Sequence, residues 1–153
     1  MHSKTIYLDN IEQTKYFASS LGKHLVSGDV ITFSGDLGSG KTTLIQHLIN
    51  SLSVDRIEVT SPSFNLLHVY KLNGLELWHF DLYRLNNAIE VYELGIEDAF
   101  LDGVSLIEWP EIIGNILPEN RLEIRLSFAE KEGSRIINLT GFCKWAKILE
   151  SEL

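Results

Sequence analysis

The sequence predicts an α/β fold with a mixed, partly antiparallel sheet flanked by helices, and we expect a single domain over residues 1–153. Three features indicate this. A glycine-rich stretch, GDLGSGKT, lies between an apolar strand-like run and a helix-like run. Asn73-Gly74, the strongest short signal for a β-hairpin, separates the strand-like runs NLLHVYKL and LELWHFDL. No repeat, low-complexity tract or flexible linker divides the chain, so it fits one hydrophobic core.

In the first third of the chain, the predicted elements alternate between strand and helix. A short strand at Thr5–Leu8 precedes a helix from Asn10 to about Leu25, where Asn10 caps the helix and Gln13 completes a capping box. The run DVITFSG is typical of a buried strand. A helix over Lys41–Leu52 is predicted because its apolar residues recur on one face at helical spacing: Leu44, Ile45, Leu48, Ile49 and Leu52.

The rest of the chain departs from a simple strand–helix repeat. The Asn73-Gly74 hairpin predicts an antiparallel pair of strands after the second helix. A helical stretch from about Ala88 to Phe100, broken near Gly95, leads to a core strand with the sequence VSLIE. Two late strands, Leu122–Phe128 and Arg135–Thr140, flank the turn EKEGS, and we expect the last residues to be helical.

The amino-acid composition indicates which kinds of partner and which cellular compartment to expect. The chain has 13 Lys and Arg against 21 Asp and Glu, a formal net charge of −8. Such a surface repels the backbone of nucleic acids, so any RNA contact is expected to run through a partner.

Cys143 is the one cysteine, which excludes an intrachain disulfide and a cysteine-based zinc site. The first residues lack the apolar core of a signal peptide, and no run approaches the ~18 apolar residues of a membrane span, so a cytoplasmic protein without membrane contact is expected.

The stretch from Gly35 to Thr42 matches G-x4-G-K-[ST] in full, between a strand and a helix as the motif requires. Its glycines allow backbone angles that bring amide N–H groups from about Gly38 to Thr43 together at a helix N-terminus, where phosphates bind. Lys41 would reach the outer phosphates. The Thr42 hydroxyl is placed to ligate Mg²⁺, which neutralises charge during phosphoryl transfer. The sequence therefore predicts a P-loop NTPase-like domain.

Two carboxylates at strand ends compete for a second metal role of the Walker-B type. ELWHFDLY ends an apolar strand at Asp81, and VSLIEWP ends one at Glu108. His79 shares a strand face with Asp81 and is a candidate partner for it, although a hydrogen-bonded, half-buried structural histidine is the commoner role. Asp81 could instead cap a helix or turn, and Glu108 could cap the helix that begins near Pro110. The residues alone favour neither carboxylate.

The absence of motifs typical of GTPases and of small-molecule kinases indicates which nucleotide and which reaction to expect. GTPases carry N-K-x-D for guanine and D-x-x-G at the switch, and neither string occurs in the chain, so adenine is the expected base. Small-molecule kinases of this class usually add an arginine-rich lid. The region after Arg84 is acidic instead, with Glu90, Glu93, Glu97 and Asp98, which disfavours a kinase without excluding it.

Five separated stretches resemble the bacterial TsaE (YjeE) family, small ATPases of tRNA threonylcarbamoyladenosine (t6A) synthesis. They are GDLGSGKTTL, VTSPSFNLL, WHFDLYRL, LGIEDAF and LIEWPE, in the order of the family and close to its spacing. The similarity runs from about Asn10 to Arg135. The phosphate loop is generic, whereas HFDLYRL together with EWP is specific to this family.

The resemblance implies ATP and Mg²⁺ as ligands and action inside a complex. TsaD-like and TsaB-like partners would transfer the threonylcarbamoyl group to tRNA, and this chain would bind and hydrolyse ATP to reset the assembly, meeting tRNA only indirectly. Thr42 and Glu108 would ligate Mg²⁺, which tilts the choice of carboxylate toward Glu108. Asp81 would be a further metal-linked or water-orienting carboxylate, so Lys41, Asp81 and Glu108 are the candidate catalytic residues. The candidate phosphate-binding residues are Leu37, Gly38, Ser39, Gly40, Lys41 and Thr42.

The resemblance also assigns roles to less distinctive positions. Ser61–Phe64 corresponds to a switch-like loop in which the family often has Thr in place of Ser63; the retained hydroxyl leaves open a metal- or γ-phosphate-sensing role beside an ordinary Ser-Pro turn. Trp109 is either a nucleotide-responsive contact or a core aromatic. Adenine contacts in the family come from the N-terminal segment and the late hairpin turn, which map onto Asn10 and Glu132.

The leading hypothesis is an ATPase switch in which Mg·ATP orders the Ser61–Phe64 loop and the side of the site that carries Asp81 and Glu108, and hydrolysis releases that order. A second hypothesis is a nucleotide-gated binding module in which occupancy controls docking and hydrolysis is incidental. A P-loop small-molecule kinase is the third.

Overall fold

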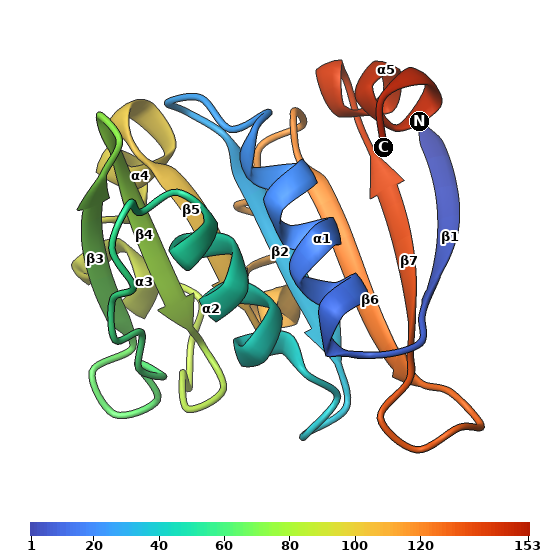
Figure 1. Cartoon of the computed structure of the whole chain (residues 1–153). Coiled ribbons are helices and arrows are strands. Elements are labelled where there is room, and N and C mark those ends of the chain that lie inside the picture. The colour runs from blue at the N-terminus through green and yellow to red at the C-terminus, as the bar shows by residue number, and fades with distance from the viewer.

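The computed structural model describes residues 1–153 and contains strands and helices in alternating groups (Figure 1). The strands are β1 (His2–Leu8), β2 (Val30–Gly35), β3 (Leu67–Leu72), β4 (Leu75–Asp81), β5 (Val104–Glu108), β6 (Leu122–Phe128) and β7 (Arg135–Gly141). The helices are α1 (Ile11–Gly22), α2 (Lys41–Ser51), α3 (Glu90–Glu93), α4 (Ile96–Asp102), α5 (Lys144–Ser151) and the 3-10 helix η1 (Pro110–Ile113).

All seven strands form one mixed sheet in the order β1-β7-β6-β2-β5-β4-β3. Strands β6, β2, β5 and β4 run parallel, whereas β1 and β7 on one edge and β3 on the other pair antiparallel to their neighbours. The predicted α/β fold with a partly antiparallel sheet is confirmed, including the hairpins β3–β4 and β6–β7. Strand β2 is the central strand of the sheet and has a parallel neighbour on each side. The loop after it therefore lies in the middle of the side of the sheet at which the parallel strands end.

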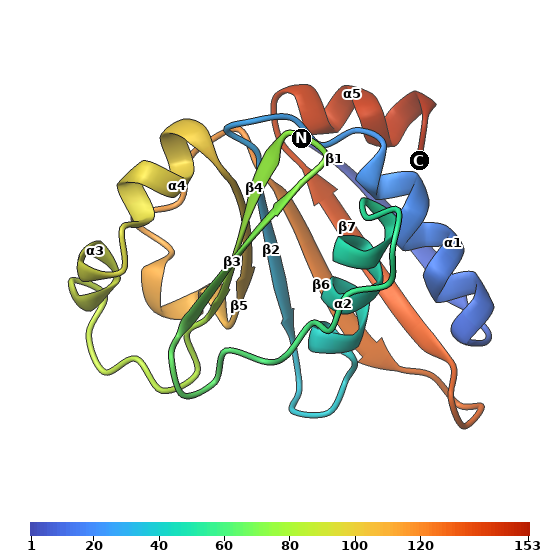
Figure 2. The same cartoon turned by 60° about the vertical axis from the view of Figure 1, so that its left-hand side comes forward.

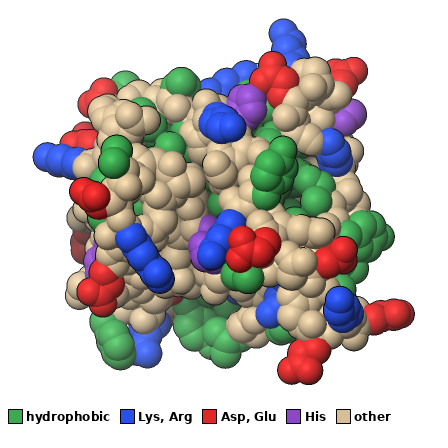
Figure 3. All heavy atoms as spheres, viewed as in Figure 1, with side chains coloured by type: hydrophobic (Ala, Val, Ile, Leu, Met, Phe, Trp, Pro, Cys, Tyr) green, Lys and Arg blue, Asp and Glu red, His purple; other side chains and the backbone are tan.

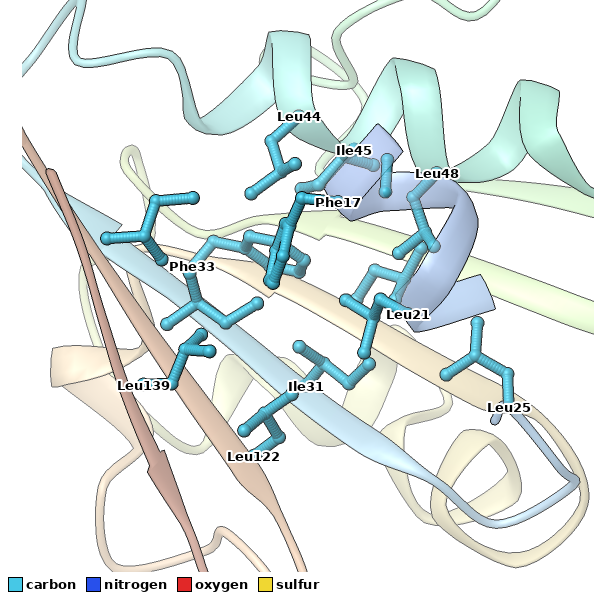
Figure 4. Close-up of a cluster of buried hydrophobic side chains, with 14 of the residues drawn as sticks. Phe17, Leu21, Leu25, Ile31, Phe33, Leu44, Ile45, Leu48, Leu122 and Leu139 are labelled. Atoms are coloured by element: carbon cyan, nitrogen blue, oxygen red, sulfur yellow. The ribbon is translucent and has the colours of Figure 1, made fainter. Parts of the chain in front are cut away.

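Helices cover both faces of the sheet. Figure 2 shows α1 and α2 on one face with α5 above them, and α3 and α4 on the other. The first face holds a core cluster that joins α1, α2 and α5 to the strands, part of which is drawn in Figure 4; Phe17, Leu21, Phe33, Leu44 and Leu48 belong to it. The second face holds a smaller cluster that includes Phe80, Val91, Ile96 and Ile107. Each fully buried side chain of this size stabilises the fold by about 1.5–3 kcal/mol, so both helix layers are fixed on the sheet.

Element boundaries differ from the sequence-based expectation most clearly at three places. Strand β1 begins at His2 and not at Thr5, because its pairing with β7 extends to His2 opposite Gly141. Helix α1 ends at Gly22 and not near Leu25, because the chain turns tightly there and the Leu25 N–H donates to the Gly22 carbonyl. Strand β3 begins at Leu67, because Leu66 takes a positive φ of 66° and its N–H donates to the Pro62 carbonyl. The expected break at Gly95 is confirmed, since this glycine has a φ of 83° and separates α3 from α4.

The predicted Asn10 cap at the start of α1 is confirmed, whereas the reciprocal bond of the predicted capping box goes to Asp9, one residue before the cap. The Asn10 side chain accepts a hydrogen bond from the Gln13 N–H at 3.0 Å, and the Gln13 side chain accepts one from the Asp9 N–H at 2.7 Å. The bond from Gln13 satisfies an N–H group that the first turn of a helix leaves free, and the bond from Asp9 holds the residue before the cap against the helix. None of the helices has both the length and the apolar character needed to cross a membrane.

Candidate functional site

The glycine-rich loop connects the carboxyl end of β2 to the start of α2, and its shape depends on glycine at two positions. Gly35 has a φ of 138°, and a Cβ atom there would lie 2.4 Å from the Leu126 carbonyl oxygen. Gly40 has a φ of 105° and precedes α2 without a side-chain cap. The first N–H groups of α2 have no partner within the helix, so they are free to bind an anion at the loop.

Lys41, the first residue of α2, is buried against the loop. Its Nζ atom donates to the carbonyl oxygens of Gly35 at 2.7 Å and Asp36 at 2.9 Å, and lies 4.1 Å from the centroid of the Trp109 ring. Burial lowers the pKa of Lys41, and nearby carboxylates, led by Glu108, oppose this shift. The loop thus places a poorly solvated cation at its centre, which favours an anionic ligand there.

Glu108 is the last residue of β5 and is almost fully buried at 2% exposure. Its Oε1 atom accepts a hydrogen bond from the Thr42 hydroxyl at 2.8 Å, and its Oε2 atom lies 2.7 Å from His79 Nε2. The structure therefore brings together Thr42 and Glu108, the two predicted metal ligands. Glu108 does not cap a helix, because the residue that precedes η1 is Trp109.

Asp81, the last residue of β4, pairs with Glu108 in the register between β4 and β5. Its Oδ1 atom accepts a hydrogen bond from the Tyr83 N–H at 3.1 Å, so Asp81 does cap a turn. Burial raises the pKa of the Asp81 carboxyl and the Glu108 charge adds to the shift, while the Tyr83 N–H opposes it. Two neighbouring carboxylates in a buried setting favour a cation between or beside them.

The expected partner of His79 was wrong. His79 and Asp81 lie on the same strand, but the His79 ring bonds to Glu108 on the neighbouring strand. The side chain is also fully buried and not half-buried. Alternation along a strand predicts which face a side chain occupies, whereas the partner on that face depends on the register with the next strand.

Two adjoining cavities open at the loop. One has a volume of about 320 Å³ and is lined by Lys41, Thr42, Asp81, Glu108 and Trp109 together with Leu37 and Gly38. The other has a volume of about 540 Å³ and is lined by Asn10 and Glu132, which are 122 positions apart in the sequence, together with Lys131 and Arg135. Gly40 and Thr43 line both cavities, so the two spaces meet at the start of α2.

The remaining candidate residues take different positions around these cavities. Ser39 is fully buried, and its hydroxyl has no hydrogen-bond partner. The Ser61–Phe64 loop contributes Ser61 and Ser63 to the smaller cavity. Phe64 is exposed, with its ring 4.8 Å from the Arg84 guanidinium, and Arg84 lines the same cavity. Trp109 packs against the second core cluster and lines the smaller cavity, so both expected roles for it are compatible with its place.

Sequence reasoning missed Arg135 as a site residue. Its Nε atom donates to the Ser39 carbonyl oxygen at 2.8 Å, and its guanidinium lies 4.8 Å from the centroid of the Phe128 ring. Arg135 begins β7, far along the chain from the loop that it contacts. Nothing local in the sequence signals this contact, because it depends on the pairing of β6 with both β2 and β7.

The oxygen atoms at the loop suit Mg²⁺. This ion takes one or two carboxylates together with phosphate and water oxygens, and rarely a cage made of protein alone. Thr42 and Glu108 place a hydroxyl and a carboxylate side by side, and Asp81 lines the same cavity. No group of three or more His, Cys, Asp or Glu side chains could hold a metal ion by itself. The residues fit an ion that is shared with a bound phosphate.

The fold and site define a mixed-sheet α/β protein that carries a G-x4-G-K-[ST] loop at the end of its central strand. The family model described as "Threonylcarbamoyl adenosine biosynthesis protein TsaE" matches residues 8–137. The chain therefore belongs to the TsaE family, whose members take part in the synthesis of t6A in tRNA. The resemblance drawn from five short stretches is confirmed.

Individual relatives agree with this assignment. The chain is 38% identical over 140 residues to the "tRNA threonylcarbamoyladenosine biosynthesis protein TsaE" of Rickettsia bellii, covering 92% of this chain and 96% of that protein. It is 40% identical over 116 residues to the protein of the same name from Bacillus subtilis, covering 75% of this chain and 72% of that one. The crystal structure of Bacillus subtilis YdiB superposes with a TM-score of 0.79 at 31% identity, covering 97% of this chain and 92% of that chain.

Proposed function

We propose that this chain binds Mg·ATP at the glycine-rich loop and hydrolyses it within the t6A modification machinery, resetting a complex of TsaD-like and TsaB-like proteins between turnovers. The observation that carries the proposal is the joining of Thr42 to Glu108 at 2.8 Å beside the buried Lys41 cation. A hydroxyl and an ammonium group from the start of α2, together with a carboxylate from the end of β5, form a set suited to a nucleotide phosphate with its metal.

The two adjoining cavities divide the nucleotide between them in this proposal. The smaller cavity holds the β- and γ-phosphates, which the first N–H groups of α2 and the Lys41 ammonium bind. The larger cavity takes the adenosine between Asn10 and Glu132, the two positions predicted to contact adenine. Gly40 and Thr43 line both cavities and would lie beside the point where the ribose joins the phosphates.

Hydrolysis requires that a water molecule be oriented toward the γ-phosphate. Mg²⁺, held by Thr42 and Glu108, would supply the neutralisation of charge that phosphoryl transfer needs. Asp81 lies on the same cavity wall as Glu108, and its carboxyl has a raised pKa, which suits a group that orients water. Lys41 stays bonded to the loop carbonyls until an anion replaces them as its partner.

Helix α2 links nucleotide occupancy to the switch-like loop. The Gln46 side chain donates to the Val59 carbonyl oxygen at 2.9 Å, and the Asn50 side chain accepts from the Ile57 N–H at 2.9 Å. The helix that begins at the phosphate loop thus holds the chain that leads into Ser61–Phe64. A change in the position of α2 when ATP binds or leaves would move that loop with it.

The surface suits partners other than bare tRNA. The net charge of −8 disfavours direct contact with a nucleic-acid backbone. In Figure 3, charged side chains of both signs are scattered over the face in view, and hydrophobic side chains lie along its lower border, where the loops after β2 and β4 lie. Leu37, Phe64 and Tyr83 are exposed apolar residues of those loops and of the switch-like loop. Protein partners at this edge would explain why they are exposed.

Phosphate release from Mg·ATP tests the proposal. The protein is assayed alone and then with TsaD-like and TsaB-like proteins from the same source, and marked stimulation by the partners is expected. Lys41→Ala serves as the control that removes the loop cation. Equally low turnover with and without partners contradicts the ATPase switch. A non-hydrolysable ATP analogue that sustains many rounds of tRNA modification would support a nucleotide-gated module instead, and a phosphorylated metabolite would indicate a kinase.

A further inference from the structure

We propose that His79 is a positioning residue that fixes the Glu108 carboxylate for the metal-bound nucleotide. This inference rests on the proposed function, because it assigns a residue to the same site. His79 reaches Glu108 from β4, and Glu108 lies at the end of the neighbouring strand β5. It contacts the opposite side of the carboxylate from Thr42.

The geometry holds both oxygens of Glu108. Oε2 lies 2.7 Å from His79 Nε2, and Oε1 accepts from the Thr42 hydroxyl at 2.8 Å. The His79 side chain has no exposed surface, so water does not compete for this bond. The two hydrogen bonds restrain rotation of the carboxylate about its last side-chain bond and keep Oε1 beside the Thr42 hydroxyl.

A role in packing alone does not account for His79. A carboxylate only accepts hydrogen bonds, so the ring donates through Nε2. The other ring nitrogen, Nδ1, is buried without a hydrogen-bond partner. An unsatisfied buried polar atom destabilises a fold, and an apolar side chain in the same place would avoid that penalty. The bond to Glu108 is the one polar interaction of the ring that offsets it.

An anchored carboxylate matters most when an ion is bound. Groups that hydrogen-bond to a metal ligand orient it, and their loss typically lowers metal affinity by about 10–100-fold. His79 should therefore affect nucleotide binding in the presence of Mg²⁺. It should have little effect on nucleotide binding without the ion, where the loop and Lys41 carry the affinity.

Two amide substitutions separate this role from a structural one. The amide nitrogen of His79→Gln lies about where Nε2 lies, whereas that of His79→Asn lies about where Nδ1 lies and falls short of Glu108. The affinity for a non-hydrolysable ATP analogue is measured by tryptophan fluorescence, with Mg²⁺ and with EDTA, since Trp109 lines the cavity. His79→Asn should lower the affinity with Mg²⁺ by about 10–100-fold and leave the affinity with EDTA unchanged. His79→Gln should stay within about threefold of the native protein.

A double-mutant cycle with Glu108→Gln sharpens the test. If His79 acts through Glu108, adding His79→Asn to Glu108→Gln should cause no further loss of affinity with Mg²⁺. Thermal unfolding of each variant checks the fold, and His79→Met, which fills the ring volume without a donor, replaces His79→Asn if that variant does not fold.

The outcomes distinguish failure of this inference from failure of the proposed function. A His79→Asn or His79→Met variant that loses thermal stability but keeps the native affinity with Mg²⁺ overturns the positioning role alone. A fully additive loss in the double mutant also overturns it. If the native protein binds the analogue equally well with Mg²⁺ and with EDTA, or does not bind it, the proposed function fails together with this inference.

Discussion

Replacing Arg135 with alanine should weaken nucleotide binding while leaving the protein folded. Arg135 donates from Nε to the Ser39 carbonyl oxygen at 2.8 Å, and so fixes the glycine-rich loop from a strand outside it. A hydrogen bond from a charged donor contributes about 1.5–3 kcal/mol. Every 1.4 kcal/mol or so corresponds to a tenfold change in affinity. If the whole free energy of this bond contributed to nucleotide binding, its loss would raise the dissociation constant about 10–150-fold. The guanidinium is only partly buried, so we expect about tenfold, the low end of this range.

The control for this variant is Arg125→Ala. Arg125 is an exposed arginine of β6, the strand beside β7, and its replacement removes the same charge without removing a side-chain hydrogen bond to the loop. The dissociation constants of ATP for both variants are measured by tryptophan fluorescence or calorimetry, together with their thermal unfolding. The reasoning is refuted if Arg135→Ala stays within about twofold of the native affinity, or if Arg125→Ala weakens binding as much.

Three further substitutions test other parts of the site. Glu108→Ala should remove hydrolysis and keep part of the nucleotide affinity, because Lys41 and the loop remain, and wild-type phosphate release in this variant would contradict the assignment. Asp81→Asn should raise the free energy of unfolding at neutral pH, because burial raises the pKa of the Asp81 carboxyl above its ordinary 3.8 and the amide has no charge to desolvate. The native protein should gain stability relative to the variant as pH falls through that raised pKa toward 3.8. Urea unfolding at several pH values measures this, and a difference in unfolding free energy between the two proteins that does not change with pH would contradict the reasoning. Gly35→Ala should destabilise the protein by about 1–3 kcal/mol or more, since its Cβ atom would lie 2.4 Å from the Leu126 carbonyl oxygen, and an unchanged thermal midpoint would exclude this clash.

Local signals predicted most of the fold. The hairpin at Asn73-Gly74, the helix cap at Asn10 and the break at Gly95 each depend on residues a few positions apart, and each is present. The glycine-rich loop was equally predictable because strand, loop and helix are consecutive. The start of β3 was not, because the turn at Leu66 has no glycine or asparagine at the residue with positive φ.

Contacts between distant strands were the part that the sequence did not reveal. Thr42 and Glu108 were assigned to one metal site through the family resemblance, whereas the spacing of residues left Asp81 and Glu108 equal. The link from His79 to Glu108 depends on the parallel register of β4 and β5. That register results from packing against the helices on both faces, and a single sequence carries no local mark of it.

The position of β2 also determines when the site can form during synthesis. Residues Val30–Gly35 leave the ribosome early, but their neighbours in the sheet are Val104–Glu108 and Leu122–Phe128. Translation proceeds at about 5–20 residues per second, so several seconds pass between the synthesis of β2 and the synthesis of both neighbouring strands. Pairings this far apart in sequence also fold slowly once they are available. A nascent chain truncated before Leu122 would therefore expose an unpaired edge of β2, whose free N–H and C=O groups could pair with a strand of another chain until β6 has been translated.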